Sequence, residues 1–202
     1  MLESTVYIID DDEAVGEALA WLLKSVKLKY KIYQNGLAFL QDYPAQATGC
    51  IVLDIRMPEI SGLDLQIELN KRGNTLPIIF ITGHGDIAMA VQAMRTGAFD
   101  FLTKPFHNQT ILEQIQRAIR QHSLLAQNKF TERLATLSQR ERTILDLLMA
   151  GKMNKEIAFE LNIALSTVEL HRSKMMQKLD CKNLVELSKN YFLLAGKHLA
   201  TN

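Results

Sequence analysis

Hydrophobic and polar positions follow different periods in the two parts of this chain. Over roughly the first 120 residues, short apolar runs alternate with longer segments in which apolar residues recur every three or four positions. Short apolar runs are typical of buried strands, and the longer segments are typical of amphipathic helices. The pattern predicts strands at 5–10, 29–33, 50–54, 77–82 and 99–104, and helices at 13–26, 36–43, 63–72, 86–96 and from 108 to 122 or beyond.

This alternation predicts an α/β domain built on one five-stranded parallel sheet. Parallel strands need crossover connections, and helical crossovers cover both faces of the sheet. The segments 50–54 and 77–82 are almost wholly apolar, as the central strands of such a sheet are, whereas 29–33 is more polar and suits an edge. We therefore expect a doubly wound first domain.

The rest of the chain shows helical periodicity and no strand pattern. Four helices are predicted, at 138–149, 154–161, 165–179 and 183–194. The polar-leaning segment before them lacks Gly and Pro, and we interpret it as a helical extension and linker. The predicted division is a first domain at 1–122, a linker at 123–136 and a smaller all-α domain at 137–202.

Two of these helices carry signals for where they begin. Ser138 with Glu141 three residues later has the pattern of a capping box, and Gly151 marks the end of the same helix. Ser166 and Thr167 are candidate caps for the helix predicted at about 165.

Charge is distributed unevenly between the two parts. The whole chain carries a net charge of +1. Residues 1–122 contain 11 Lys and Arg against 14 Asp and Glu, a net −3, whereas residues 123–202 contain 12 against 8, a net +4. An acidic α/β part and a basic helical part predict two functions, the second of them involving a polyanion.

Nothing in the sequence predicts secretion or membrane insertion. The first residues lack the basic segment and the long apolar core of a signal peptide, and no apolar run approaches the length that spans a bilayer. Cys50 and Cys181 lie far apart and form neither a metal-ligand pair nor a redox pair. We expect a cytoplasmic protein in a reducing compartment, without a membrane partner.

Polar side chains follow several predicted strands at the same edge of the sheet. The first strand ends at Asp10 and Asp11, the third at Asp54, the fourth at Thr82 and the fifth at Lys104. The carboxyl ends of parallel strands meet at one edge, where ligands bind in this class of fold. Each residue alone has an ordinary explanation as a helix cap, a turn residue or a solvated charge. Their arrival at one edge favours a functional site.

Three carboxylates and one ammonium would leave this site with a net charge of −2. Carboxylates that lie close together raise one another's pKa, and a hard divalent cation balances the excess charge. Mg²⁺ prefers oxygen ligands, and the main-chain carbonyl of Arg56 is a further candidate ligand. Beside such a cation, Asp54 could act as the nucleophile toward a phosphoryl group. Lys104 would neutralise charge, and the Thr82 hydroxyl would hydrogen-bond a phosphoryl oxygen.

The motifs "IIDDDEAV", "VLDIRMPEISG", "IFITGHGD" and "FDFLTKPF" span nearly all of residues 1–122. Together they resemble the receiver domain of two-component response regulators, and "ITGHGDIAMAV" resembles the FixJ-like branch. The resemblance implies a flavodoxin-like fold and a cis peptide bond between Lys104 and Pro105. It implies that a sensor histidine kinase phosphorylates Asp54, with Asp10, Asp11, Asp54 and the Arg56 carbonyl as Mg²⁺ ligands, Thr82 as the switch residue and Lys104 as the charge partner.

The predicted helices at 154–161 and 165–179 are joined by a tight turn within a basic segment. Two short helices arranged in this way are typical of a DNA-binding helix-turn-helix, although charge alone would favour a plain helical bundle with a solvated basic face. The stretches "LSQRE", "GKMNKEIA" and "STVELHRSKMMQKL" resemble the LuxR-type helix-turn-helix, over about 137–193. The two resemblances together identify the chain as a member of the NarL/FixJ family, with promoter DNA as a partner.

The outer face of helix 165–179 is predicted to contact the bases and phosphates of DNA. Ser173 could hydrogen-bond a base edge, Glu169 could accept from cytosine N4, and Leu170 could touch a thymine methyl. Glu169 stands where many relatives carry Lys, which argues against a phosphate contact and favours either a base contact or the avoidance of other partners. The resemblance implies that His171 packs inward. Basic side chains would mostly meet phosphate. The DNA-contacting candidates are Lys155, Thr167, Glu169, Leu170, Arg172, Ser173, Lys174 and Lys178.

Phosphorylation is expected to couple the two domains through a second copy of the chain. We expect phosphorylated Asp54 to draw Thr82 inward and Phe101 to fill the space it leaves, which would reshape the face formed by helix 86–96 and strand 99–103. Two paired copies would place their recognition helices on half-sites about one turn of DNA apart. The residues expected at this homodimer interface are Val91, Arg95 and Asp100.

Two other functions are weighed against this one. A magnesium phosphatase could also use an aspartyl nucleophile after a strand, but such enzymes usually carry a second acid two residues later, where this chain has Arg56. Alternatively, the helical domain could bind a protein instead of DNA. We expect a regulator rather than an enzyme, with RNA polymerase as a candidate further partner.

Overall fold

The computed structural model describes residues 4–43, 47–83 and 87–198, the last four of these by their backbone. By its contacts the chain divides into two compact units, Met1–Leu124 and Leu125–Asn202. The first unit alternates strands and helices: β1 (Thr5–Ile9), α1 (Glu13–Ser25), β2 (Lys29–Tyr33), α2 (Gly36–Asp42), β3 (Gly49–Asp54), α3 (Gly62–Lys71), β4 (Ile78–Thr82), α4 (Ile87–Arg95), β5 (Asp100–Thr103) and the first part of α5 (Asn108–Ala135).

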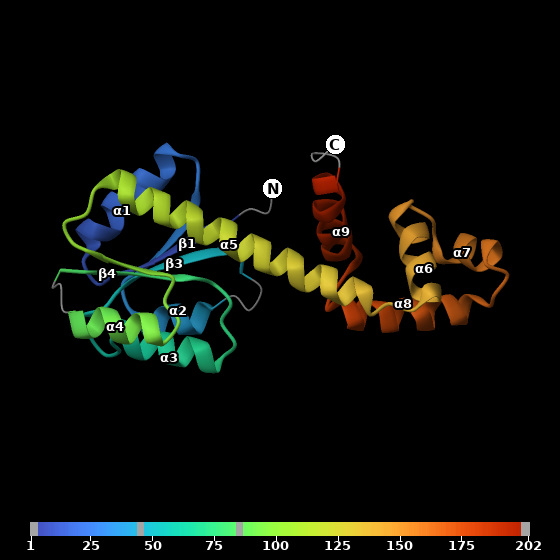
Figure 1. The fold of residues 1–202 in the computed structure, drawn as a ribbon, viewed down its shortest axis with the longest axis horizontal. Helices are drawn as coiled ribbons and strands as arrows, with labels where there is room; N and C mark the ends of the chain where they lie inside the picture. Colours follow the sequence, from blue (N-terminus) through green and yellow to red (C-terminus); the bar gives the residue numbers. More distant parts are fainter. Residues whose placement is uncertain (1–3, 44–46, 84–86, 199–202) are drawn as a thin grey trace. The chain divides into compact units, whose positions relative to one another are not determined.

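The five strands form one parallel sheet in the order β2-β1-β3-β4-β5. Helices α1 and α5 cover one face, and α2, α3 and α4 cover the other (Figure 1). The winding reverses between β1 and β3, which creates a crevice beyond their carboxyl ends. The sequence predictions of the α/β class, the five strands and the polar edge strand β2 are confirmed, with strand ends that differ by at most one residue.

Alternating side chains along each strand build a separate hydrophobic core on each face of the sheet. On β1, for example, Ile8 packs toward α1 and α5, whereas Ile9 packs toward α2 and α3. Strand β3 is buried along its whole length, because helices cover it on both faces. This rigid central strand carries Asp54 at its end.

The second unit is entirely helical in its described residues. It contains the last part of α5, then α6 (Gln139–Met149), α7 (Asn154–Glu160), α8 (Leu165–Leu179) and α9 (Leu184–His198). One core joins these helices, and Phe130 of α5 is part of it. The segment predicted as a helical extension is therefore helical and continuous with the last helix of the first unit. None of the helices described combines the length and the apolar character needed to cross a membrane.

One predicted cap is present and another is wrong. At the start of α6 the Ser138 hydroxyl accepts from the Glu141 N–H (3.3 Å), and the Glu141 carboxylate accepts from the Ser138 N–H (2.8 Å), so the capping box forms. At α8 the cap is neither Ser166 nor Thr167. Its N-cap is Ala164, whose carbonyl already accepts the first helical N–H bonds, so both hydroxyl residues lie inside the first turn.

Candidate functional site

The sheet register brings the predicted polar residues to one edge. Asp10 directly follows the last residue of β1 and lies level with Asp54, the last residue of β3. Thr82, the last residue of β4, pairs with Thr103 of β5, so Lys104 stands just beyond the same edge. The Lys104 N–H donates to the Thr82 carbonyl at 2.7 Å, which extends the ladder by one bond.

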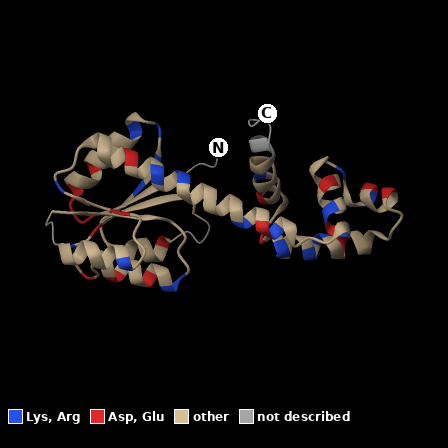
Figure 2. Ribbon diagram, viewed as in Figure 1, with Lys and Arg blue, Asp and Glu red and all other residues tan. Residues whose placement is uncertain are grey.

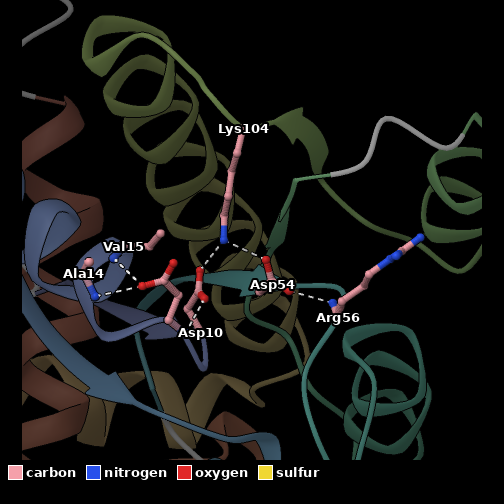
Figure 3. Close-up of polar contacts among 7 residues, drawn as sticks. Asp10, Ala14, Val15, Asp54, Arg56 and Lys104 are labelled. Carbon is pink, nitrogen blue, oxygen red and sulfur yellow. Dashed lines mark hydrogen bonds and ion pairs between the residues drawn. The ribbon is translucent and has the colours of Figure 1, made fainter.

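The Lys104 ammonium lies between two carboxylates. Its Nζ is 2.7 Å from Asp10 Oδ2 and 2.8 Å from Asp54 Oδ1 (Figure 3). Both carboxylates are buried, with 1% of Asp10 and 5% of Asp54 exposed. Residues nearly 100 positions apart in the sequence therefore form one charged cluster, beside the crevice that the strand order creates.

Main-chain N–H groups satisfy the remaining carboxylate oxygens. Asp10 Oδ1 accepts from the Asp12 N–H at 3.0 Å, and Asp54 Oδ2 accepts from the Arg56 N–H at 2.6 Å. The Arg56 side chain points away from the cluster (Figure 3). The Asp12 carboxylate caps α1 by accepting from the N–H groups of its first turn, so the ordinary capping explanation holds for this third acid of the run.

Burial dominates the electrostatics of this cluster. Loss of water raises the pKa of Asp10 above its ordinary value, although hydrogen bonds from Lys104 and from the Asp12 N–H lower it in part. Burial alone would lower the pKa of Lys104, but its hydrogen bonds to Asp10 and Asp54 more than offset this and raise it. The ammonium therefore stays charged at neutral pH, opposite two carboxylates.

The other predicted residues of this site have different positions. Asp11 is exposed, and among the described residues no group of three or more His, Cys, Asp or Glu side chains is arranged to hold a metal ion. Thr82 is buried, and Phe101 is half-buried against the core on the α2–α4 face. Of the residues predicted to meet at this edge, Asp10, Asp54 and Lys104 are therefore in direct contact.

The donor atoms fit a hard divalent cation. The carboxylates of Asp10 and Asp54 offer oxygen atoms only, which are the ligands that Mg²⁺ prefers. Burial raises the pKa of Asp10, so a cation bound beside this carboxylate would stabilise its charged form. The exposed Asp11 lies next to Asp10 in the sequence and could supply a further oxygen.

The turn after β3 packs its main chain against the site. The Gly62 N–H donates to the Ile55 carbonyl at 2.8 Å, and a Cβ at position 62 would lie 2.2 Å from the main-chain oxygen of Asp54. Glycine is therefore required at this close approach. The buried Met57 side chain holds the same turn against the core on the α2–α4 face.

Helices α7 and α8 form the candidate DNA interface. Their inner faces are buried at Ile157, Ala158, Val168, Met175 and Leu179, and Leu161 packs half-buried against the same core. The outer face of α8 exposes Glu169, Leu170, Ser173 and Lys174, and α7 exposes Lys155, whereas Thr167, His171 and Arg172 are half-buried. Figure 2 shows basic residues spaced along α8.

Two of the predicted phosphate-binding side chains already have partners within the helical unit. Arg172 Nη1 donates to Asn154 Oδ1 at 3.1 Å, and Lys178 Nζ lies 2.6 Å from Glu141 Oε2. A DNA contact by either side chain would have to compete with these bonds. A cavity of about 750 Å³ on this surface is lined by Asn154, Glu169, Arg172, Ser173 and residues of the turn between α8 and α9.

The structure also reveals exposed apolar residues that the sequence did not mark, among them Ile87, Met94 and Trp21. On α4, Ile87 is 80% exposed and lies in one stripe with Val91 and Met94. On α1, Trp21 is 74% exposed. The helical spacing of Ile87, Val91 and Met94 was visible in the sequence, but exposure depends on which face packs against the sheet.

The three residues predicted at the homodimer interface lie on or next to α4. Val91 and Arg95 are exposed on α4, and the half-buried Asp100 accepts from the Phe101 N–H at 2.8 Å. Residue 86, the predicted first residue of this helix, lies outside the described residues.

A parallel sheet in this strand order, with a lysine paired to two acids at its carboxyl edge, defines a receiver-type domain, and here it is followed by a helix-turn-helix unit. Residues 6–116 match the family of the response regulator receiver domain, and residues 135–189 match the luxR family of bacterial regulatory proteins. The chain belongs to the two-component response regulators that join a receiver domain to a LuxR-type DNA-binding domain. The family expected from the sequence is thereby confirmed.

Similar proteins match both units together. The response regulator protein TmoT of Ectopseudomonas mendocina is 44% identical over 92% of this chain and 86% of its own. The transcriptional regulatory protein FixJ of Rhizobium meliloti is 42% identical over 93% of this chain and 94% of its own. Among solved structures, full-length FixJ of B. japonicum is 36% identical, covers 95% of this chain and 97% of its own, and has a TM-score of 0.59. The structure of the response regulator StyR is 39% identical, covers 94% of this chain and 98% of its own, and has a TM-score of 0.58.

Proposed function

We propose that this protein is a transcription regulator controlled by phosphorylation of Asp54. A sensor histidine kinase supplies the phosphoryl group, two receiver domains then pair, and α8 binds promoter DNA. The observation that carries the proposal is the Lys104 ammonium, held within 2.8 Å of both buried carboxylates at the edge of the sheet.

The chemistry assigned to the site is transfer of a phosphoryl group from a phosphohistidine. An Asp54 oxygen forms the new O–P bond while the P–N bond breaks, and the imidazole nitrogen of the kinase keeps the electron pair. Asp10, Asp11, Asp54 and the Arg56 carbonyl would hold Mg²⁺, which when bound supplies positive charge next to the phosphoryl oxygens. Lys104 supplies a second positive charge, which is half-buried and already held against both carboxylates.

The phosphoryl group adds negative charge at Asp54, and this charge drives the switch. Lys104 and the Thr82 hydroxyl are the donors assigned to the new oxygens, and Phe101 fills the space that Thr82 leaves. The face formed by α4 and β5 then pairs with its copy. The exposed stripe Ile87, Val91 and Met94 supports this face as the interface, because it offers apolar area that water otherwise covers.

A surface for the kinase borders the same site. A largely apolar cavity of about 500 Å³ is lined by residues of α1 and by Lys104, Pro105 and Phe106. A phosphohistidine must approach Asp54 closely, so its carrier must dock on the surface around Lys104.

The helical unit is assigned to promoter DNA. Exposed residues of α8 offer hydrogen-bonding and apolar groups in the first half of a helix, as DNA recognition helices do. Ser173, Glu169 and Leu170 are the proposed base contacts, and Lys155 and Lys174 are the proposed phosphate contacts. RNA polymerase remains a candidate partner of the assembled dimer.

Size-exclusion chromatography with a small phosphodonor and Mg²⁺ tests the proposal. The wild-type protein is expected to shift to a dimer, whereas Asp54→Asn is expected to stay monomeric because it lacks the nucleophilic oxygen. Asp64→Asn, which changes an exposed carboxylate at the start of α3, is the matched control and should behave as wild type. Equal dimerisation of Asp54→Asn would contradict the proposal. Steady release of phosphate from a phosphomonoester would favour a phosphatase instead.

A further inference from the structure

Helix α4 is attached to the sheet by little apolar burial. Of its nine residues only Ala93 is buried, whereas α1 buries five residues against the same sheet. Its most apolar stripe, which contains Ile87, Val91 and Met94, is exposed instead. Since apolar burial usually holds a helix in place, the position of α4 must depend more than usual on other contacts.

Two amide side chains of α3 provide those contacts at the C-terminal end of α4. Gln66 Nε2 donates to the Ala93 carbonyl at 3.3 Å, and Asn70 Nδ2 donates to the Thr96 carbonyl at 3.0 Å. Figure 1 shows α3 and α4 on the same face of the sheet. The N-terminal end of α4 follows β4, which ends at Thr82. These two hydrogen bonds therefore hold α4 at its C-terminal end. Along the chain, that end is farther from Thr82, the proposed switch residue, than the N-terminal end is.

Gln66 is an unusual residue for this position. Only 1% of it is exposed, and its Oε1 has no hydrogen-bond partner within the part of the chain that the structure describes. A buried polar atom without a partner costs free energy, so a packing role alone would favour an apolar residue of similar size. What the amide adds over such a residue is a donor aimed at the main chain of α4.

We propose that Gln66 and Asn70 are positioning residues of the phosphorylation switch. Their amides hold the C-terminal end of α4 in the conformation seen with an unmodified Asp54. They thereby set the fraction of unphosphorylated protein in which the α4–β5 face can pair. This inference rests on the proposed function and adds to it the residues that keep the switch off.

The test uses isosteric changes that remove the donors without removing volume. In Gln66→Glu and Asn70→Asp an oxygen replaces the amide nitrogen and faces a main-chain carbonyl, so the contact becomes repulsive. Both changes are made in the full-length Asp54→Asn background, which lacks the phosphoacceptor. Glu68→Gln is the matched control, because Glu68 lies on the same helix and pairs with Lys71 and Arg72 instead of α4.

Sedimentation velocity over a concentration series measures the dimer dissociation constant. Each variant is expected to lower this constant by about fivefold, which corresponds to the loss of one ordinary hydrogen bond, and Gln66→Glu is expected to act more strongly because its charge is buried. Glu68→Gln should leave it unchanged. Thermal unfolding is recorded alongside, since a purely structural role would lower stability without changing dimerisation.

The outcomes separate the inference from the function on which it rests. Tighter dimerisation of both variants without a phosphodonor supports the inference. If the variants are destabilised while their dimer constants equal that of the Asp54→Asn parent, the inference is overturned and the proposed function is unaffected. If the wild-type protein itself fails to dimerise with phosphodonor and Mg²⁺, the proposed function fails and the inference fails with it.

Discussion

At the scale of single residues, the most informative feature of this protein is a half-buried lysine whose ammonium lies between two buried acids. The sequence placed Asp10, Asp54 and Lys104 at strand ends. The parallel register of the sheet then brings these strand ends to one edge. It did not show that Asp11 would stay exposed while Lys104 contacts the other two acids. The side chains of consecutive residues leave the main chain in different directions, and here Asp10 contacts Lys104 whereas Asp11 is exposed. The functional roles of these residues stay predictions.

Gly62→Ala is expected to damage the site through the main chain. The added methyl group would lie 2.2 Å from the Asp54 carbonyl, so the turn must move away. We expect a loss of about 1–3 kcal/mol in the free energy of unfolding, as for other overpacked positions, and slower phosphorylation by a small phosphodonor. Gly73→Ala is the control. Gly73 has a positive φ of 74° and open space around it, so its substitution should reduce stability without slowing phosphorylation.

Asp10→Asn is expected to change how stability depends on pH. Burial raises the folded-state pKa of Asp10, so between its ordinary pKa and the raised value the folded state binds more protons than the unfolded state. Wild-type stability therefore falls as pH rises through that window, whereas the variant has no such titration. Urea unfolding at pH 4 and pH 7 should show the variant gaining on the wild type at pH 7. A difference that is equal at both pH values would contradict this prediction.

At the scale of elements, local sequence signals predicted helix starts and helical segments correctly where the sequence offered a single pattern. Ser138 and Glu141 form the predicted capping box, and the stretch from 123 to 135 is helical because it contains neither Gly nor Pro. The predicted cap of α8 failed because Ala164 precedes two hydroxyl residues, and helical bonding begins before either of them. The N-cap of a helix is the residue at which the preceding turn ends. The packing of the neighbouring helices determines where that turn ends.

Glu141→Gln tests the start of α6. Burial alone would raise the pKa of Glu141, but the Lys178 ammonium and the Ser138 N–H more than offset this and lower it. The resulting stabilisation is present above the ordinary pKa of a glutamate and is lost as pH falls through the lowered value. At pH 7 the variant should lose about 1–2 kcal/mol of local stability, seen as faster amide hydrogen exchange in α6. At pH 3 the difference from wild type should shrink.

At the scale of the whole molecule, an acidic receiver unit and a basic helical unit share one chain and one long helix. The opposite charges suit a phosphate-accepting site with a bound cation in the first unit and a polyanion in the second. The sequence predicted two domains of opposite charge from charge and periodicity, and the family matches cover residues 6–116 and 135–189. Under the proposed function, pairing of receivers would double the DNA contacts and so couple the two activities.

The salt dependence of promoter binding separates the two kinds of contact on α8. Lys174→Ala should reduce the slope of log affinity against log salt by about 0.9, because one phosphate contact is lost. Ser173→Ala should leave the slope unchanged and reduce discrimination between sites, by about 1–3 kcal/mol at the base it contacts. Fluorescence anisotropy at several salt concentrations measures both effects, with Lys152→Ala as a control outside α8. A wild-type affinity that does not change with salt would remove the basis for assigning DNA to this surface.

By itself, the sequence determined the elements, their order, the parallel sheet and the family, because periodicity and strand-end motifs are local and survive without knowledge of packing. The tertiary structure decided which side chains meet. Lys104 contacts two carboxylates, Gln66 reaches the main chain of α4, and Lys178 pairs with Glu141 in place of solvent. These contacts join positions 27 to 94 residues apart, and their geometry depends on strand register and helix packing, which no local pattern encodes.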